Sequence, residues 1–287
     1  MQKNSSNKSK VTTPWWQSIC RPASSAKVSN ILDYGISQPL NNQSAIDQYL
    51  ANTEALIIQG TKTLLDSSPE IANLFFIGVV SHTENYFREL FSKLLQICPS
   101  SQAKSSNRDI KLGSVIWFKT GQIERGAFES FSFASSENIT DTAKRYFDIS
   151  IEPKSDSHAL LDQYDLLCEL RHSIVHSAGF MSGKNALKMH FPRTNNNLRA
   201  NLNFSRFQEA TSVCTALVYA LNRDFFKQFR ARWRDDWPKR VPHWTDSMSN
   251  KSFNELWEIF HSKTDAHRNA ITLQLSRAKC KAEIIKP

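Results

Sequence analysis

The chain has 287 residues, of which 40% are hydrophobic and 11% aromatic. This composition suffices for a packed core and excludes a disordered chain, and only 8 glycines argue against a glycine-rich phosphate-binding architecture and for a helical one. The formal net charge is +9, so a polyanion such as nucleic acid is the expected class of partner, although a basic surface alone also serves solubility.

The five cysteines are odd in number, widely spaced and never in a CxxC pair. They predict neither a disulfide framework nor a zinc ribbon. Residues 1–13 are polar and offer no signal sequence, and the longest apolar run, residues 74–80, is too short to cross a bilayer. We therefore expect a cytoplasmic protein that does not associate with membranes.

In chain order, residues 1–13 are predicted to be a disordered tail. The stretch 44–65 has helical spacing, and Ser44 and Asp47 are placed like a capping pair. A second helix is predicted from Ser68 and Pro69 to about residue 97, with an apolar stripe along one side. Pro99 is expected to end it, and residues 99–109 to form a polar loop.

Residues 110–135 are compatible with a strand or a helix, because glycines interrupt the pattern. Further helices are predicted over 138–147, over 157–178 with a stop at Gly179, and from a capping box at Ser205 and Gln208 to Trp237. One or two more are expected over 253–276. The pattern predicts an all-α protein with irregular or small β insertions, with a helical domain over 14–250 and a C-terminal helical extension over 251–287.

The segment 157–178 contains one residue that breaks its own pattern. On a helical wheel its apolar side chains lie on one side and most of its acidic residues and histidines on the other, but Arg171 lies in the middle of the apolar arc. Because arginine cannot lose its charge on burial, we expect Arg171 to meet a carboxylate, a phosphate or a cleft. A pairing with Glu84 would make it structural. The other interpretation is an anion-binding cleft.

His176 follows Arg171 by five residues, which is about 140° around a helix and about 7.5 Å along it. The two side chains therefore do not share one face of a straight helix, but a second copy across a two-fold axis would bring two such pairs to one groove. Histidine can act as base or acid near neutral pH, and arginine binds phosphate oxygens. These residue types suit metal-independent RNA cleavage by the 2′-OH, which leaves 2′,3′-cyclic phosphate and 5′-OH ends and needs no cofactor.

The stretch LRHSIVHSAG, residues 170–179, resembles the Arg-x4-His signature of the HEPN superfamily. The resemblance implies a HEPN-like helical bundle that forms a ribonuclease cleft by dimerisation, with Arg171 and His176 as the catalytic pair. His172 would take a variable polar position, where Asn or Asp is more usual. Glu84 resembles an acidic residue that many members carry on an earlier helix. Members are often toxins or abortive-infection effectors, which implies a role in bacterial antiviral defence and a neutralising or regulatory protein partner.

Two other constellations compete with this interpretation. Glu169, His172 and His176 share a helix face with the Glu-x-x-His spacing of di-iron bundles. Such a site also needs two further carboxylates from other helices, and no metal is expected. The segment 223–240 interleaves basic and aromatic residues. Its aromatics, Trp233 and Trp237 among them, are expected to be core residues rather than stacking platforms. Its charges are predicted to contact an RNA backbone, through Arg230, Arg232, Arg234, Lys239 and Arg240.

The sequence thus predicts a homodimeric HEPN endoribonuclease that acts on single-stranded or looped RNA, including tRNA. The main alternative is a catalytically silent HEPN-like module that binds RNA, nucleotide or protein. A third possibility is a structural all-α protein with Arg171 in an ordinary salt bridge and no open cleft near His176.

Overall fold

The computed structural model describes residues 19–21, 25–38, 42–118 and 122–286. The chain divides into two compact units, residues 1–42 and 43–287. In the described part of the first unit, the short 3₁₀ helix η2, Ile31–Tyr34, is capped by the Asn30 side chain. The predicted tail over 1–13 lies outside the described residues.

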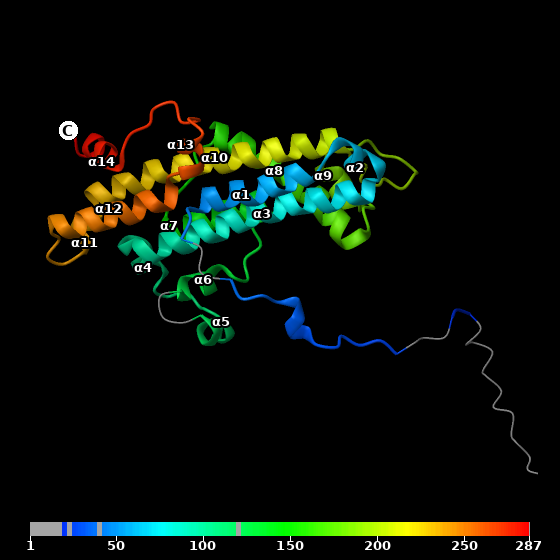
Figure 1. Cartoon of the computed structure of the whole chain (residues 1–287), viewed down its shortest axis with the longest axis horizontal. Helices are drawn as coiled ribbons and strands as arrows, with labels where there is room; N and C mark the ends of the chain where they lie inside the picture. The colour runs from blue at the N-terminus through cyan, green and yellow to red at the C-terminus, as the bar shows by residue number, and fades with distance from the viewer. Residues whose placement is uncertain (1–18, 22–24, 39–41, 119–121, 287) are drawn as a thin grey trace, which may run out of the picture. The chain divides into compact units, whose positions relative to one another are not determined.

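The second unit is built from helices, and its described residues contain no strand, only one isolated bridge between Phe180 and Arg199. The all-α prediction is confirmed. Figure 1 shows the long helices α1, α3, α8, α10 and α12 side by side. The helices are α1 Ala45–Gln59, α2 Lys62–Ser67, α3 Pro69–Ile97, α4 Pro99–Ser105, α5 Leu112–Trp117, α6 Ile123–Phe128, α7 Ser136–Phe147, α8 Asp156–Ser177, α9 Gly183–Lys188, α10 Phe204–Asp235, α11 Trp237–Arg240, α12 Asp246–Phe260, α13 Lys263–His267 and α14 Arg277–Ile285.

Helix α3 is central and packs against α1, α2, α6, α8, α10 and α12. It begins and ends where the sequence predicts: the Ser68 hydroxyl accepts a hydrogen bond from the Glu70 N–H, and Pro69 opens the first turn. Its predicted apolar stripe is fully buried. A 29-residue helix with one buried stripe is stabilised mainly by this packing rather than by helix propensity.

The core around α3 is aromatic. The Phe91 ring lies 5.2 Å from the ring of Phe147 on α7, 5.5 Å from Phe133, 6.0 Å from Phe128 on α6 and 5.8 Å from Phe225 on α10. Aromatic rings bury large areas and add about 0.5–1.5 kcal/mol per well-placed pair. This cluster ties the middle of the chain, residues 123–147, to the long helices.

Three local predictions were wrong. Residues 99–109 are not a polar loop throughout. Pro99 follows the end of α3 but also begins α4, because its fixed φ suits the first position of a helix. The stretch 44–65 is two helices, since Gly60 lies against Phe75 and Phe207 and a new helix starts after Thr61. The cap of α10 is Asn203, which lies two residues before the predicted Ser205. Its side chain accepts a hydrogen bond from the Arg206 N–H.

The ambiguous segment 110–135 forms the two short helices α5 and α6 in its described part. At the C-terminal side, the boundary proposed at residue 250 lies inside α12, where Phe253 and Leu256 are buried in the same core as α3 and α10. None of the described helices combines the length and the apolar character needed to cross a membrane.

Candidate functional site

Helix α8 carries the candidate site, and its two ends are well defined. The Ser155 hydroxyl caps the first turn, and the helix ends at Ala178 and Gly179, both with positive φ (50° and 88°). The Gly179 N–H donates to the Ser173 carbonyl (3.1 Å), and the Gly179 carbonyl accepts from the Ala200 N–H (2.8 Å). The predicted helix with its glycine stop is confirmed to within one residue at each end.

Arg171 lies on the side of α8 that faces α3, as its place in the apolar arc predicts. The nearest Arg171 nitrogen, Nη2, is 3.8 Å from Glu84 Oε2, with the two side chains 26% and 11% exposed. This distance is longer than a hydrogen bond. The Arg171 Nε is buried without a hydrogen-bond partner among the described residues. The guanidinium is thus attracted by one carboxylate but keeps unused donors and an opening to solvent.

Glu84 is held from the other side by the loop before α7. Its Oε1 accepts three hydrogen bonds of 3.0 Å each, from the Ser132 hydroxyl and from the backbone N–H groups of Phe133 and Ala134. One oxygen therefore anchors the loop, and the other faces Arg171. Because the carboxylate is fixed by three donors, it holds its charge in a constant position beneath the guanidinium.

His172 and His176 lie on the solvent side of α8, one turn apart. Both residues are exposed, and their ring centroids are 4.6 Å apart. The structure therefore brings the four predicted catalytic residues together as two pairs, Arg171 with Glu84 and His172 with His176. No hydrogen bond joins the two pairs among the described residues. The angular separation of Arg171 and His176 expected from the helix period is present in the single chain.

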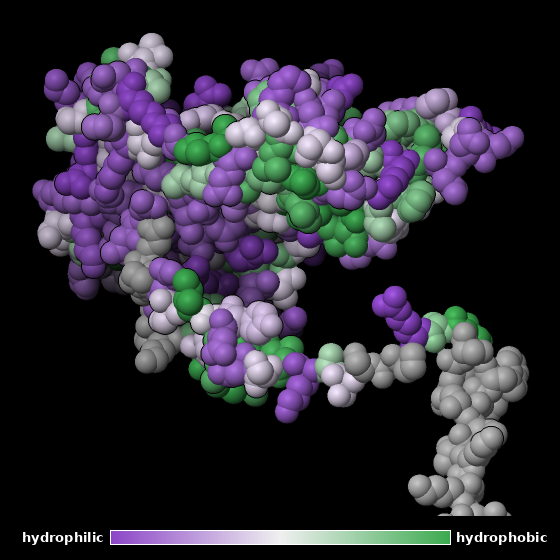
Figure 2. All heavy atoms as spheres, turned by 45° about the vertical axis from the view of Figure 1, so that its right-hand side comes forward, coloured by the Kyte–Doolittle hydropathy of each residue, from purple (hydrophilic) through white to green (hydrophobic). Residues whose placement is uncertain are grey.

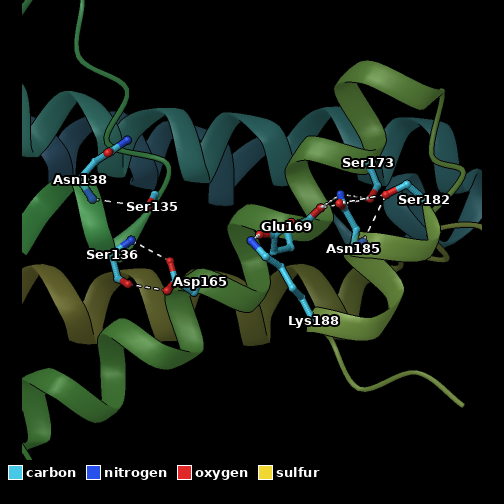
Figure 3. Close-up of polar contacts among 9 residues, drawn as sticks. All are labelled: Ser135, Ser136, Asn138, Asp165, Glu169, Ser173, Ser182, Asn185 and Lys188. Atoms are coloured by element: carbon cyan, nitrogen blue, oxygen red, sulfur yellow. Dashed lines mark hydrogen bonds and ion pairs between the residues drawn. The ribbon is translucent and has the colours of Figure 1, made fainter.

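A row of polar contacts, not predicted from the sequence, supports a third face of α8 (Figure 3). Asp165 accepts from the Ser136 backbone N–H at 2.7 Å and from its hydroxyl, which docks the start of α7. The buried Asn185 of α9 donates to the Ser173 hydroxyl at 3.1 Å. Ser182 and Asn185 form a helix-capping pair in the sequence, which is the signal that could have revealed α9.

The competing di-iron interpretation finds no support in these contacts. The Glu169 carboxylate forms an ion pair with Lys188 of α9, and the described residues contain no grouping of three or more potential metal ligands. Cys168, on the buried side of α8, has a pKa raised well above the usual thiol value by burial. It is a packing residue of the core.

The basic segment 223–240 is not part of this site. Helices α8 and α10 meet where the Ser157 hydroxyl donates to Asp224 (2.5 Å). From that point Arg171 lies about 21 Å along α8 in one direction, and Arg230 about 9 Å along α10 in the other, at about 1.5 Å per residue. The five predicted RNA-binding cations thus begin about 30 Å from Arg171 and extend farther away.

Several of these cations already have partners within the chain. Arg232 donates to the Asp148 carbonyl (3.2 Å), Arg234 pairs with Asp235 (2.8 Å) and Arg240 with Asp236 (2.8 Å). Trp233 and Trp237 are buried, so they are core residues, as favoured, and are excluded as stacking platforms for bases. The cations that the structure places near the end of α8 are others, notably Arg199, whose guanidinium lies 5.6 Å from the centre of the Phe180 ring.

Comparison of the chain with models of protein families, with curated proteins and with solved structures finds no match.

Proposed function

We propose that the protein is a metal-independent endoribonuclease of the HEPN type, with Arg171 and His176 at its centre. The observation that carries the proposal is an incompletely paired arginine, 26% exposed and 3.8 Å from Glu84, on the same helix as two exposed histidines within five residues of it. The resemblance of residues 170–179 to the HEPN signature supports it.

In this proposal Arg171 binds the scissile phosphate with the part of its guanidinium that is open to solvent, while Glu84 holds the guanidinium in place without saturating it. One histidine takes the proton of the 2′-OH as its oxygen attacks phosphorus. A second gives a proton to the departing 5′-oxygen, so the products are a 2′,3′-cyclic phosphate and a 5′-OH. The 140° between Arg171 and His176 requires a groove with two walls, which a homodimer with facing α8 helices would supply.

The test is incubation of the protein with RNA in EDTA, followed by end-group analysis. His176→Ala should reduce cleavage by about 10²–10⁴-fold, the usual contribution of a general acid or base, and Arg171→Gln should reduce it comparably. His158→Ala is the matched control, because His158 is an exposed histidine near the start of the same helix. Circular dichroism and light scattering should show an unchanged fold and oligomeric state for each variant. Equal cleavage by the His176 and His158 variants would refute the catalytic assignment.

The second candidate is a module without catalytic activity in which Arg171 supports the fold, and the contact of Arg171 with Glu84 favours it. It predicts that Arg171→Gln destabilises the protein while His176→Ala changes neither stability nor any RNA-dependent property. Measuring stability and cleavage on the same two variants separates the candidates.

A cellular role in bacterial defence, with a neutralising or regulatory partner, rests on the family resemblance. It predicts that expression of the wild-type chain in bacteria arrests growth and that expression of His176→Ala does not. Arrest by both variants would separate toxicity from the proposed chemistry.

A further inference from the structure

A second polar feature lies at the end of α8, outside the four residues of the proposed catalytic site. A pocket of about 660 Å³ opens between α9 and the following loop, which is the yellow-green loop at the right-hand end of Figure 1. Figure 2 brings this end forward and shows apolar and hydrophilic side chains next to each other there. The volume is within the range of about 300–1,000 Å³ that small-molecule sites occupy.

Backbone hydrogen bonds connect the pocket directly to the catalytic helix. The N–H of Met181 donates to the carbonyl of Leu198 (2.9 Å), and both residues line the pocket. One step away, Gly179 accepts from Ala200 (2.8 Å) where α8 ends. Met181 is five residues after His176, so the Cα atoms of these two residues are at most about 17 Å apart. This is within reach of a few nucleotides of one RNA strand.

The pocket lining combines three kinds of side chain. Leu187 and Phe191 give an apolar wall and are 60% and 39% exposed. Three consecutive amides, residues 195–197, are exposed and make no side-chain hydrogen bond within the described part of the chain. Arg193 is exposed and has no ion pair among the described residues.

This combination of aromatic, amide and arginine side chains suits the binding of a nucleobase. Unpaired bases bind proteins by stacking on aromatic side chains and by hydrogen bonds to their edges, and amides offer both donor and acceptor for such edges. An unpaired arginine beside them suits the phosphate of the same nucleotide. A paired base in a duplex has its faces covered by neighbouring bases and its pairing edge occupied, so a site that contacts both the face and the edge of a base accepts only unpaired bases.

We propose that this pocket binds an unpaired nucleobase of single-stranded RNA, with Phe191 as the stacking surface and the 195–197 amides on the base edge. The ligand class rests on the proposed ribonuclease function, because the pocket would position the strand whose phosphodiester reaches Arg171 and His176.

Binding is measured by fluorescence anisotropy with labelled eight-nucleotide oligoadenylate and oligouridylate and with a fully paired hairpin, in EDTA and on the His176→Ala background. Phe191→Ala should weaken binding of the single strands by about 5- to 100-fold, the range for losing one base stack. Phe191→Tyr should restore it. Arg193→Gln should lower affinity and make the salt dependence shallower by about one phosphate contact. Leu273→Ala, which removes an exposed apolar side chain outside this pocket, should leave binding unchanged.

The outcomes separate this inference from the ribonuclease proposal. If wild-type protein cleaves RNA and Phe191→Ala changes neither oligonucleotide affinity nor KM, the pocket assignment is overturned and the ribonuclease stands. If wild-type protein does not cleave RNA but binds single strands in a way that depends on Phe191 and is rescued by Tyr, the pocket assignment stands and the ribonuclease proposal is overturned. Absence of single-strand binding, or equal binding of the hairpin, overturns the pocket assignment.

Discussion

Glu84 offers the sharpest test of how the site is held together, because its two oxygens have different tasks. Oε1 accepts the three loop donors and Oε2 faces Arg171. Glu84→Gln keeps an acceptor for the loop and removes the charge, whereas Glu84→Ala removes both. The two variants should therefore differ in free energy of unfolding by an amount set by the loop hydrogen bonds.

The magnitudes follow from the geometry. At an effective dielectric constant of about 20, unit charges 3.8 Å apart attract by about 4 kcal/mol, and solvent at the partly exposed guanidinium lowers the net value to about 1–2 kcal/mol. This is the expected cost of Glu84→Gln. Glu84→Ala also leaves the buried Phe133 N–H without an acceptor, which costs about 1–3 kcal/mol, and weakens the hold on Ala134. Its total should be about 3–5 kcal/mol.

The assay is urea unfolding followed by circular dichroism for Glu84→Gln, Glu84→Ala, Arg171→Gln and the Gln–Gln double variant. The double-mutant cycle should give a coupling of about 1–2 kcal/mol between Glu84 and Arg171. Two results would refute the reasoning: a coupling near zero, which would mean that the 3.8 Å contact carries no energy, or equal losses for the Gln and Ala variants.

Three groups outside the site give further predictions. Burial alone would raise the pKa of Asp47, but hydrogen bonds from a hydroxyl and two N–H groups at the start of α13 outweigh it and lower the pKa. This stabilisation is present above the unfolded-state value near pH 3.9 and is lost as the pH falls through the folded pKa. Asp47→Asn should therefore cost about 2–4 kcal/mol in urea unfolding at neutral pH and clearly less in acid, and equal losses would contradict this. Gly179→Ala should lower the free energy of unfolding by about 1–2 kcal/mol, because φ at Gly179 is 88°. Gly183→Ala adds a methyl group in open space and should be neutral or stabilising. A lower melting temperature for Gly183→Ala than for Gly179→Ala would exclude this explanation. Burial raises the pKa of the Cys214 thiol to about 12, so a thiol reagent at neutral pH should label exposed Cys20 in native protein and Cys214 only after unfolding, as mass mapping would show.

Much of the fold could be predicted because its signals are local. Ser68 and Pro69 start α3 and Gly179 follows the end of α8 through interactions with residues a few positions away, which the sequence displays directly. The errors arose where two local signals compete. Asn203 and Ser205 are both good helix caps, and Pro99 both ends one helix and begins the next.

The residues of the candidate site could be named from the sequence, but their geometry could not. A charge in an apolar arc must find a partner or an opening, so Arg171 could be singled out and Glu84 named with it. That the contact is 3.8 Å long and leaves donors free depends on how α3 and α8 pack, and no local pattern contains this information. The basic segment 223–240 shows the same limit of sequence-based prediction. Charge and spacing do not reveal that its cations lie at the C-terminal end of α10, whereas Arg171 on α8 lies beside the other end of that helix.

The sequence alone determined an all-α chain, the helix that carries Arg171 and His176, and the residue types available for chemistry, because periodicity, caps and stops act over a few residues. Only the tertiary structure decided which of these residues meet: Glu84 with Arg171, His172 with His176, and an amide-rich pocket at the end of α8. These contacts are set by the packing of helices distant in the chain, because a shift of one helix by a few ångströms against another changes which side chains touch.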